Sequence, residues 1–204
     1  MGSIDTYNGS CVLAMAGEHC VAICSDRRLG VNMQTISKEF DHIFRMNDTI
    51  YLGLSGLATD IRTVYEKLRY ETSLVEHQEE RLLTAEKFTN MLANMLYEKR
   101  FGPYFITPVV AGLINGEPYL ATSDCIGAMS YPKDFATGGT AEQNLFGICE
   151  SLWHPGMGPE ELAEVAANCL TAAVERDGIS GWGGILYLIT PEGVTVREIK
   201  TRMD

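Results

Sequence analysis

No stretch of this sequence is apolar over anything close to the ~20 residues that a membrane-spanning helix requires. The first nine residues lack both the basic start and the apolar segment of a signal peptide. Positive charge is also scarce, because 16 Lys and Arg residues stand against 27 Asp and Glu, which gives a net charge of −11. Sequence-independent nucleic-acid binding needs a basic surface. We therefore expect neither a membrane nor a nucleic acid as a partner.

Cysteine and histidine do not occur in the spacings that are typical of metal sites. The six cysteines form no CxxC pair, and most of them lie inside apolar runs, where Cys behaves as a small hydrophobe. The four histidines show no i,i+4 spacing with one another. We expect reduced core thiols, as in a cytosolic or nuclear protein, and no metal or other cofactor.

The hydrophobic pattern predicts a single domain over residues 1–204 in which blocks of strands alternate with pairs of helices. The N-terminal apolar runs do not alternate with polar residues, which favours sheets covered on both faces. We therefore predict an α+β layered sandwich with the helices outside and the sheets inside. The predicted strands are 11–16, 20–25, 43–46, 50–55, 109–114, 119–123, 185–189 and 194–199.

Four helices are predicted between these strands from apolar residues at helical spacing. They begin near Leu57, Thr84, Thr140 and Pro159. Thr140 and Gln143 have the spacing of a capping box, and Pro159 suits the first position of a helix. The charged residues 76–81 indicate a solvated link between the first two helices.

Three short motifs occur in an order and spacing typical of one protein family. Residues 22–30 resemble an AADxRxxxG signature, residues 53–60 resemble a strand ending in a glycine turn, and residues 176–181 resemble an RDxxSG element. Over nearly its whole length the sequence therefore resembles the beta subunits of the proteasome core particle. Further strings, such as residues 97–104 and 149–153, indicate one particular subunit type within that family.

This resemblance implies the four-layer α-β-β-α sandwich of N-terminal nucleophile hydrolases, which agrees with the predicted layers. It also implies a place in a seven-membered beta ring that stacks on a second beta ring and is capped by alpha rings. The expected partners are other alpha and beta subunits and unfolded polypeptide substrates, in ATP- and ubiquitin-dependent degradation. The resemblance implies that this protein degradation takes place in the cytoplasm and nucleus, and it implies no cofactor.

An active subunit of this family uses a threonine at its own N-terminus, exposed by self-cleavage behind a glycine. The hydroxyl attacks a peptide carbonyl while the α-amine, whose ordinary pKa is ~7.7–8.0, takes the proton. By position this residue is Ser10 here, directly after Gly9. Ser10 is therefore either the nucleophile of an endopeptidase or the residue that opens the first strand.

Two positions argue against catalysis. The family's lysine, which tunes the nucleophile, corresponds to His42, whose ring is shorter and mostly neutral at pH 7. We predict instead a half-buried histidine paired with Asp41 or with a backbone carbonyl. The family's serine beside the nucleophile aligns with Gly139, so the hydroxyl is missing at that position.

The remaining site residues do not decide the question, because carboxylates and glycine turns also hold an inactive subunit together. We favour a non-catalytic structural subunit, not an enzyme by itself, within a threonine-type endopeptidase complex. Residues 1–9 are then an unprocessed N-terminal extension. Cys11 is no substitute nucleophile, because neighbouring residues of a strand point to opposite faces. The retained residues are Asp26, Gly56, Asp177 and Ser180.

In this family the wall of one subunit helps to shape the substrate pocket of its neighbour. Residues 123–127 correspond to that wall. We expect Asp124 and Cys125 to line the specificity pocket of an adjacent trypsin-like subunit, where a carboxylate favours basic substrate side chains. The alternative is that Asp124 is a strand-end aspartate that faces water.

Overall fold

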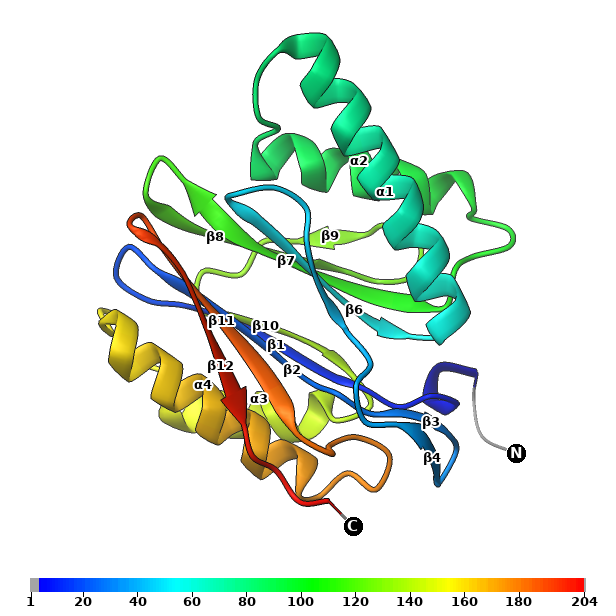
Figure 1. The fold of residues 1–204 in the computed structure, drawn as a ribbon, viewed down its shortest axis with the longest axis vertical. Coiled ribbons are helices and arrows are strands. Elements are labelled where there is room, and N and C mark those ends of the chain that lie inside the picture. Colours follow the sequence, from blue (N-terminus) through cyan, green and yellow to red (C-terminus); the bar gives the residue numbers. More distant parts are fainter. Residues whose placement is uncertain (1–3, 204) are drawn as a thin grey trace.

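The computed structural model describes residues 4–203, which form four layers (Figure 1). Within this range two antiparallel sheets of five strands pack face to face. One has the order β10-β1-β2-β11-β12, with strands Phe135–Gly139, Cys11–Ala16, Val21–Asp26, Gly184–Thr190 and Gly193–Ile199. The other has the order β5-β6-β7-β8-β9, with strands Ile43–Arg45, Ile50–Gly56, Ile106–Ile114, Glu117–Ser123 and Met129–Ser130.

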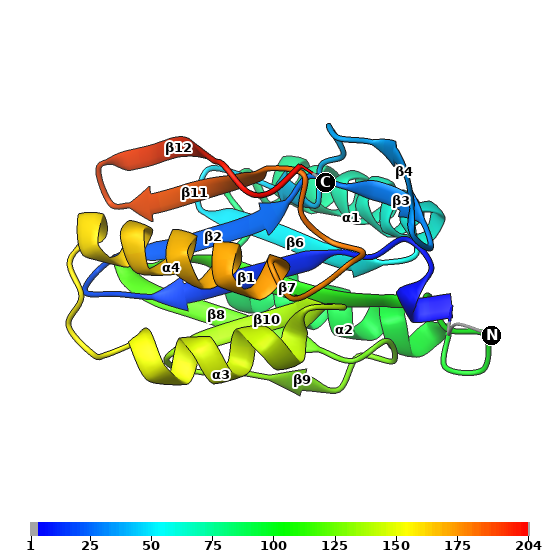
Figure 2. The same cartoon turned by 90° about the horizontal axis from the view of Figure 1, so that it is seen from below.

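A pair of helices covers the outer face of each sheet (Figures 1 and 2). Helices α1 (Ala58–Glu79) and α2 (Ala85–Glu98) pack on the sheet that contains β6 and β7. Helices α3 (Glu142–Leu152) and α4 (Pro159–Val174) pack on the sheet that contains β1 and β2. The predicted α+β class and the α-β-β-α layering are therefore confirmed.

Strand β1 shows why its sequence is apolar without alternation. Leu13 and Met15 point to helices α3 and α4, whereas Val12 and Ala14 point to the opposite sheet, and all four are fully buried. Each large aliphatic side chain buried in this way stabilises the fold by roughly 1.5–3 kcal/mol. Alternate residues of one strand thus enter two different cores, and the prediction of sheets covered on both faces is confirmed.

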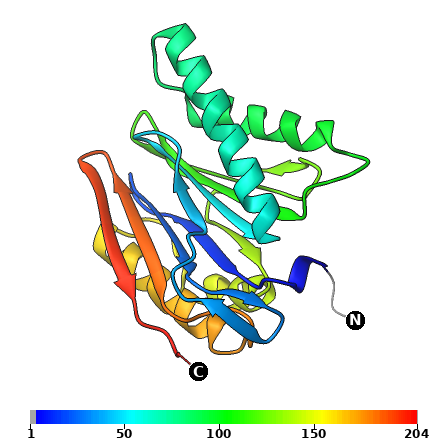
Figure 3. The same ribbon diagram turned by 45° about the vertical axis from the view of Figure 1, so that its right-hand side comes forward.

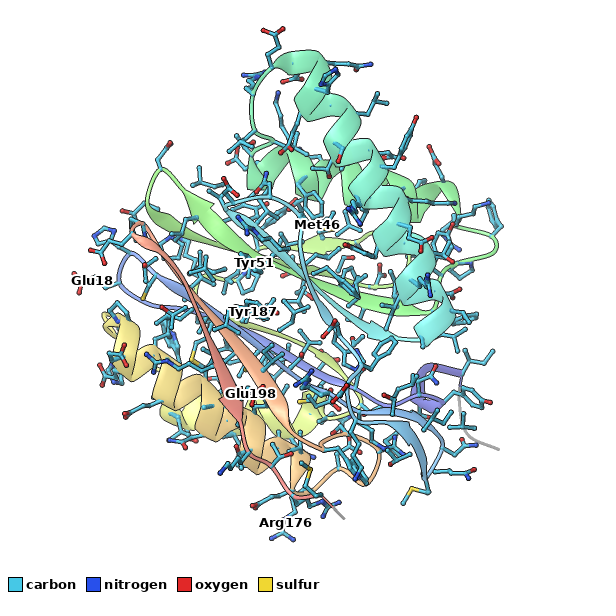
Figure 4. The ribbon with its side chains drawn as sticks, viewed as in Figure 1. Glu18, Met46, Tyr51, Arg176, Tyr187 and Glu198 are labelled. Carbon is cyan, nitrogen blue, oxygen red and sulfur yellow. The ribbon has the colours of Figure 1, made fainter. Side chains whose placement is uncertain are left out.

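The space between the sheets is filled by side chains from both of them. Tyr51 of β6 and Tyr187 of β11 point toward one another there (Figure 4), with ring centroids 5.3 Å apart. The same layer contains Val109 and Ala111 of β7. The two sheets are therefore joined by a continuous apolar core.

The predicted link at residues 76–81 is wrong in its bounds, since α1 continues to Glu79. Glu76 is not a solvated residue of a loop. Its carboxylate accepts hydrogen bonds from the Asn47 side chain and from the Leu83 backbone, both at 2.9 Å, and so ties the end of α1 to two loops. These two hydrogen bonds fix the last turns of α1.

The predicted capping box at Thr140 is also wrong. Helix α3 begins at Glu142, and its N-cap residue, Ala141, makes no side-chain cap. The Thr140 hydroxyl instead donates to Asp177, 37 positions away. The Thr140 hydroxyl therefore bonds to a residue far away in the sequence and not to the helix N-terminus that the local motif predicts.

A short hairpin of strands β3 (Leu29–Val31) and β4 (Gln34–Ser37) was not predicted. It lies beside the 3₁₀ helix η1 (Ile4–Thr6) at one end of the sandwich (Figures 2 and 3). The backbone N–H of Asn32 in its turn donates to the carbonyl oxygen of Tyr7 at 2.7 Å. Among residues 4–203, no helix is both long and apolar enough to cross a membrane.

Candidate functional site

Ser10 lies at the start of β1 and is buried between the ends of the two sheets. Its hydroxyl accepts a hydrogen bond of 3.4 Å from the backbone N–H of Gly56, the last residue of β6 in the opposite sheet. Its own backbone N–H donates to the Thr140 hydroxyl at 3.3 Å. In an oxyanion site a backbone donor points at the carbonyl oxygen of the substrate, whereas this N–H points at the serine oxygen itself.

A carboxylate with two hydroxyl donors lies on the far side of Thr140. The Oδ2 atom of Asp177 accepts from Thr140 Oγ1 at 2.6 Å and from Ser180 Oγ at 2.8 Å. Asp177 and Ser180, two of the four retained residues, are thus linked to the nucleophile position through Thr140. The sequence did not indicate Thr140 as a site residue.

Gly139 lies against Ser10 and leaves no room for a side chain at this position. Its φ is +103°, and a Cβ atom there would lie 2.2 Å from the carbonyl oxygen of Ser10. Thr140, the next residue, supplies the hydroxyl instead. The expectation that the site lacks this hydroxyl is therefore corrected. The only signal in the sequence was a threonine next to the aligned position.

Asp26 is fully buried at the end of β2 and holds the base of the site together. Its two oxygens accept from the backbone N–H groups of Cys11, at 2.9 Å, and of Gly181, at 3.0 Å. Burial raises the pKa of this carboxyl, and the nearby His42 and the backbone donors lower it by less. A carboxylate held by backbone amides orients the backbone on both sides of the site.

His42 is 1% exposed, so the prediction of a half-buried side chain is wrong. Its Nδ1 atom lies 3.2 Å from the Leu54 carbonyl oxygen, and its Nε2 atom lies 3.2 Å from that of Arg28 and 3.7 Å from Asp26 Oδ1. The predicted backbone-carbonyl partner is confirmed, whereas the predicted partner Asp41 is exposed. Within the described residues neither ring nitrogen hydrogen-bonds to Ser10. His42 therefore contacts the backbone carbonyl groups near Asp26 and not the nucleophile position.

Comparison with known proteins identifies the family to which this chain belongs. The model of the family described as "Proteasome subunit" matches residues 6–189. The chain belongs to the proteasome subunit family. Proteins of this family assemble with other proteasome subunits, and the particle that they form is a protease.

Several members of the proteasome family are similar to this chain from end to end. Proteasome subunit beta type-3 of Oryza sativa subsp. japonica is 50% identical over 203 residues, which cover 99% of this chain and 100% of the relative. The protein of the same name in Drosophila melanogaster is 46% identical, with the same two shares. The one in Saccharomyces cerevisiae is 44% identical over 206 residues and all of both chains.

The proteasome-type site retains a hollow of about 450 Å³ beside Ser10. Gly56, Thr107, Thr140 and Gln143 line it, and Thr6 of the N-terminal segment closes one side. No group of three or more His, Cys, Asp or Glu side chains within residues 4–203 is arranged to hold a metal ion. Glu142 and Phe105 also line this hollow.

The two residues expected in a proteasomal pocket wall lie in the turn after β8. Asp124 is exposed, and its Oδ1 atom accepts from the backbone N–H groups of Ile126, at 3.0 Å, and Ala128, at 2.9 Å. Cys125 is half-buried. The Asp124 carboxylate thus caps its own turn, and its role toward a neighbouring subunit stays a prediction.

Proposed function

We propose that this chain is the beta type-3 subunit of a proteasome core particle, working in the cytoplasm and nucleus as a non-catalytic member of the seven-membered beta ring. The end-to-end similarity to beta type-3 subunits of a plant, an insect and a yeast supports the subunit type. The strings at residues 97–104 and 149–153, which indicate one subunit type, lie within this similarity. Its work is to complete the ring in which neighbouring subunits degrade unfolded polypeptides.

The buried position of His42 is the observation that carries the non-catalytic assignment. An active subunit needs a fixed positive charge beside its nucleophile, and His42 occupies the place of that lysine. Both of its ring nitrogens face backbone carbonyl oxygens. Both ring nitrogens are thus held by the backbone near Asp26, and within the described residues neither hydrogen-bonds to Ser10. His42 therefore does not act on the nucleophile position as the lysine of an active subunit does.

The alternative of a Ser10 nucleophile needs a free α-amine at residue 10, because an amide nitrogen does not accept a proton. Mass spectrometry of the intact subunit from purified core particles tests this directly. We expect a mass that retains residues up to Gly9 and no adduct with an electrophilic proteasome inhibitor. A chain that begins at Ser10 and carries the inhibitor on its hydroxyl would overturn the assignment.

Substitution of the hydroxyl gives the corresponding kinetic prediction. We expect particles with Ser10→Ala to keep all their peptidase rates, because no substrate bond is attacked from this position. Loss of the 3.4 Å hydrogen bond from Gly56 leaves one backbone N–H without this acceptor, which lowers the stability of the subunit by about 1–3 kcal/mol but removes no catalytic group. Peptidase assays on particles matched for subunit content measure this. Selective loss of one activity would contradict the prediction.

The pocket-wall role of Asp124 is a separate proposal with its own test. Asp124→Asn keeps the oxygen that caps the turn and removes the charge, so it should weaken cleavage after basic residues in a neighbouring subunit. An exposed ion pair is worth up to ~1 kcal/mol, so the loss should be up to about fivefold. The exposed Glu192→Gln is the matched control. Equal rates in wild-type particles and both variants would reject this role.

A further inference from the structure

Asn8 caps a helix that begins fifty positions further along the chain. Helix α1 has no side-chain cap of its own at Leu57, and its first backbone N–H, that of Ala58, donates to Asn8 Oδ1 at 2.9 Å. The amide group of the same side chain donates to the carbonyl oxygen of Gly30 in β3 at 2.7 Å. Asn8 is 7% exposed, so breaking these contacts leaves buried polar groups without partners.

Arg28 fastens the backbone of the same segment from the other side. It is fully buried, and within the described residues it forms no ion pair. Its guanidinium donates to the carbonyl oxygens of Asn8 (3.3 Å), Ile179 (2.7 Å) and Asn32 (2.9 Å). The Cζ atom of this group lies 4.9 Å from the centroid of the Trp182 ring. Hydrogen bonds from a charged donor are stronger than neutral ones. One buried cation thus joins the N-terminal segment, the β3–β4 hairpin and the loop that follows Asp177.

We propose that Asn8 and Arg28 form a latch that holds residues 4–9 in place as a permanent part of the fold and shields the Gly9–Ser10 bond from proteases. A protease needs several residues on each side of the bond in an extended, accessible form. Here such an opening would break the bonds to Gly30, Ala58 and Arg28 together. The cleavage rate then follows the small population of the open form. The latch rests on the proposed function. It explains how the peptide bond between Gly9 and Ser10 stays intact in a ring whose neighbouring subunits cleave peptide bonds.

Limited proteolysis of the full chain tests the latch. The variant Asn8→Ala removes both side-chain hydrogen bonds, so cleavage between residues 4 and 10 should become roughly tenfold faster or more. Digestion with a protease of broad specificity, followed by intact-mass measurement, counts the chains that have lost the segment. The control is Asn94→Ala, the same change at an exposed residue of α2. It should be cut at the wild-type rate.

Asn8→Asp serves as the second variant and stays informative where Asn8→Ala does not fold. It keeps an oxygen acceptor for the Ala58 N–H, where a negative charge also suits a helix N-terminus, and loses the donor to Gly30. Its cleavage rate should lie between those of wild type and Asn8→Ala. Folded Asn8 variants that are cut no faster than wild type would overturn the latch. Loss of residues 1–9 from wild-type particles would instead contradict the proposed function, so the two failures are distinct.

Discussion

Asp26→Asn should lower the free energy of unfolding by about 3 kcal/mol at pH 7, since each buried donor left without an acceptor costs about 1–3 kcal/mol. The carboxylate accepts from the backbone N–H groups of Cys11 and Gly181 through different oxygens. An asparagine side chain offers one oxygen, and its NH₂ group would face the second N–H. Urea denaturation followed by circular dichroism measures the loss. The matched control is Asp124→Asn at an exposed aspartate, which should stay within ~0.5 kcal/mol of wild type.

The pH dependence of this loss follows from the raised pKa of Asp26. In the unfolded chain an aspartate has a pKa of ~3.9. Between that pH and the higher folded pKa, the folded state holds a proton that the unfolded state has lost, so wild-type stability falls as pH rises. Asparagine does not titrate. The wild-type advantage over Asp26→Asn should therefore be larger at pH 5 than at pH 7.5, and an advantage that shrinks on acidification would contradict the raised pKa.

The layered fold could be predicted from the sequence because its signals are local. Residues 11–16 are apolar at every position, and the structure sends alternate side chains into two cores. The β3–β4 hairpin has no such signal. Its strands are three and four residues long, and Ile36 is 64% exposed, so no periodic apolar face forms. Tertiary contacts through Arg28 and Tyr7 hold this hairpin instead.

The sequence predicted which residues belong to the site, but it did not predict the contacts among them. Ser10, Asp26, Gly56, Asp177 and Ser180 gather at the ends of the two sheets, as their positions in the family motifs imply. Thr140 and the Asn8–Arg28 latch were missed, since their partners lie far away in sequence. The Ser10–Thr140 contact spans 130 positions, and the Arg28–Ile179 contact spans 151. No local pattern carries such pairings.

Gly56→Ala should lower the free energy of unfolding by about 3 kcal/mol or more, because left-handed strain and steric overlap each cost about 1–3 kcal/mol. Gly56 has a φ of +120°, and a Cβ atom there would lie 2.2 Å from the carbonyl oxygen of Phe105. The backbone of Phe105 and Ile106 cannot move away without disturbing the β6–β7 ladder, in which Gly56 pairs with Ile106. The melting temperature should fall by roughly 6–12 °C at 2–4 °C per kcal/mol.

Gly147→Ala is the matched control and should act in the opposite direction. Gly147 lies inside α3, is exposed, and has no atom within 4 Å of the added Cβ. Alanine there restricts the unfolded chain and suits the helix, which stabilises by about 0.5–1 kcal/mol. Differential scanning calorimetry of both variants compares the two signs directly. A Gly56→Ala protein that melts at or above the wild-type temperature would mean that the end of β6, and with it the N–H that faces Ser10, is not fixed by close backbone packing.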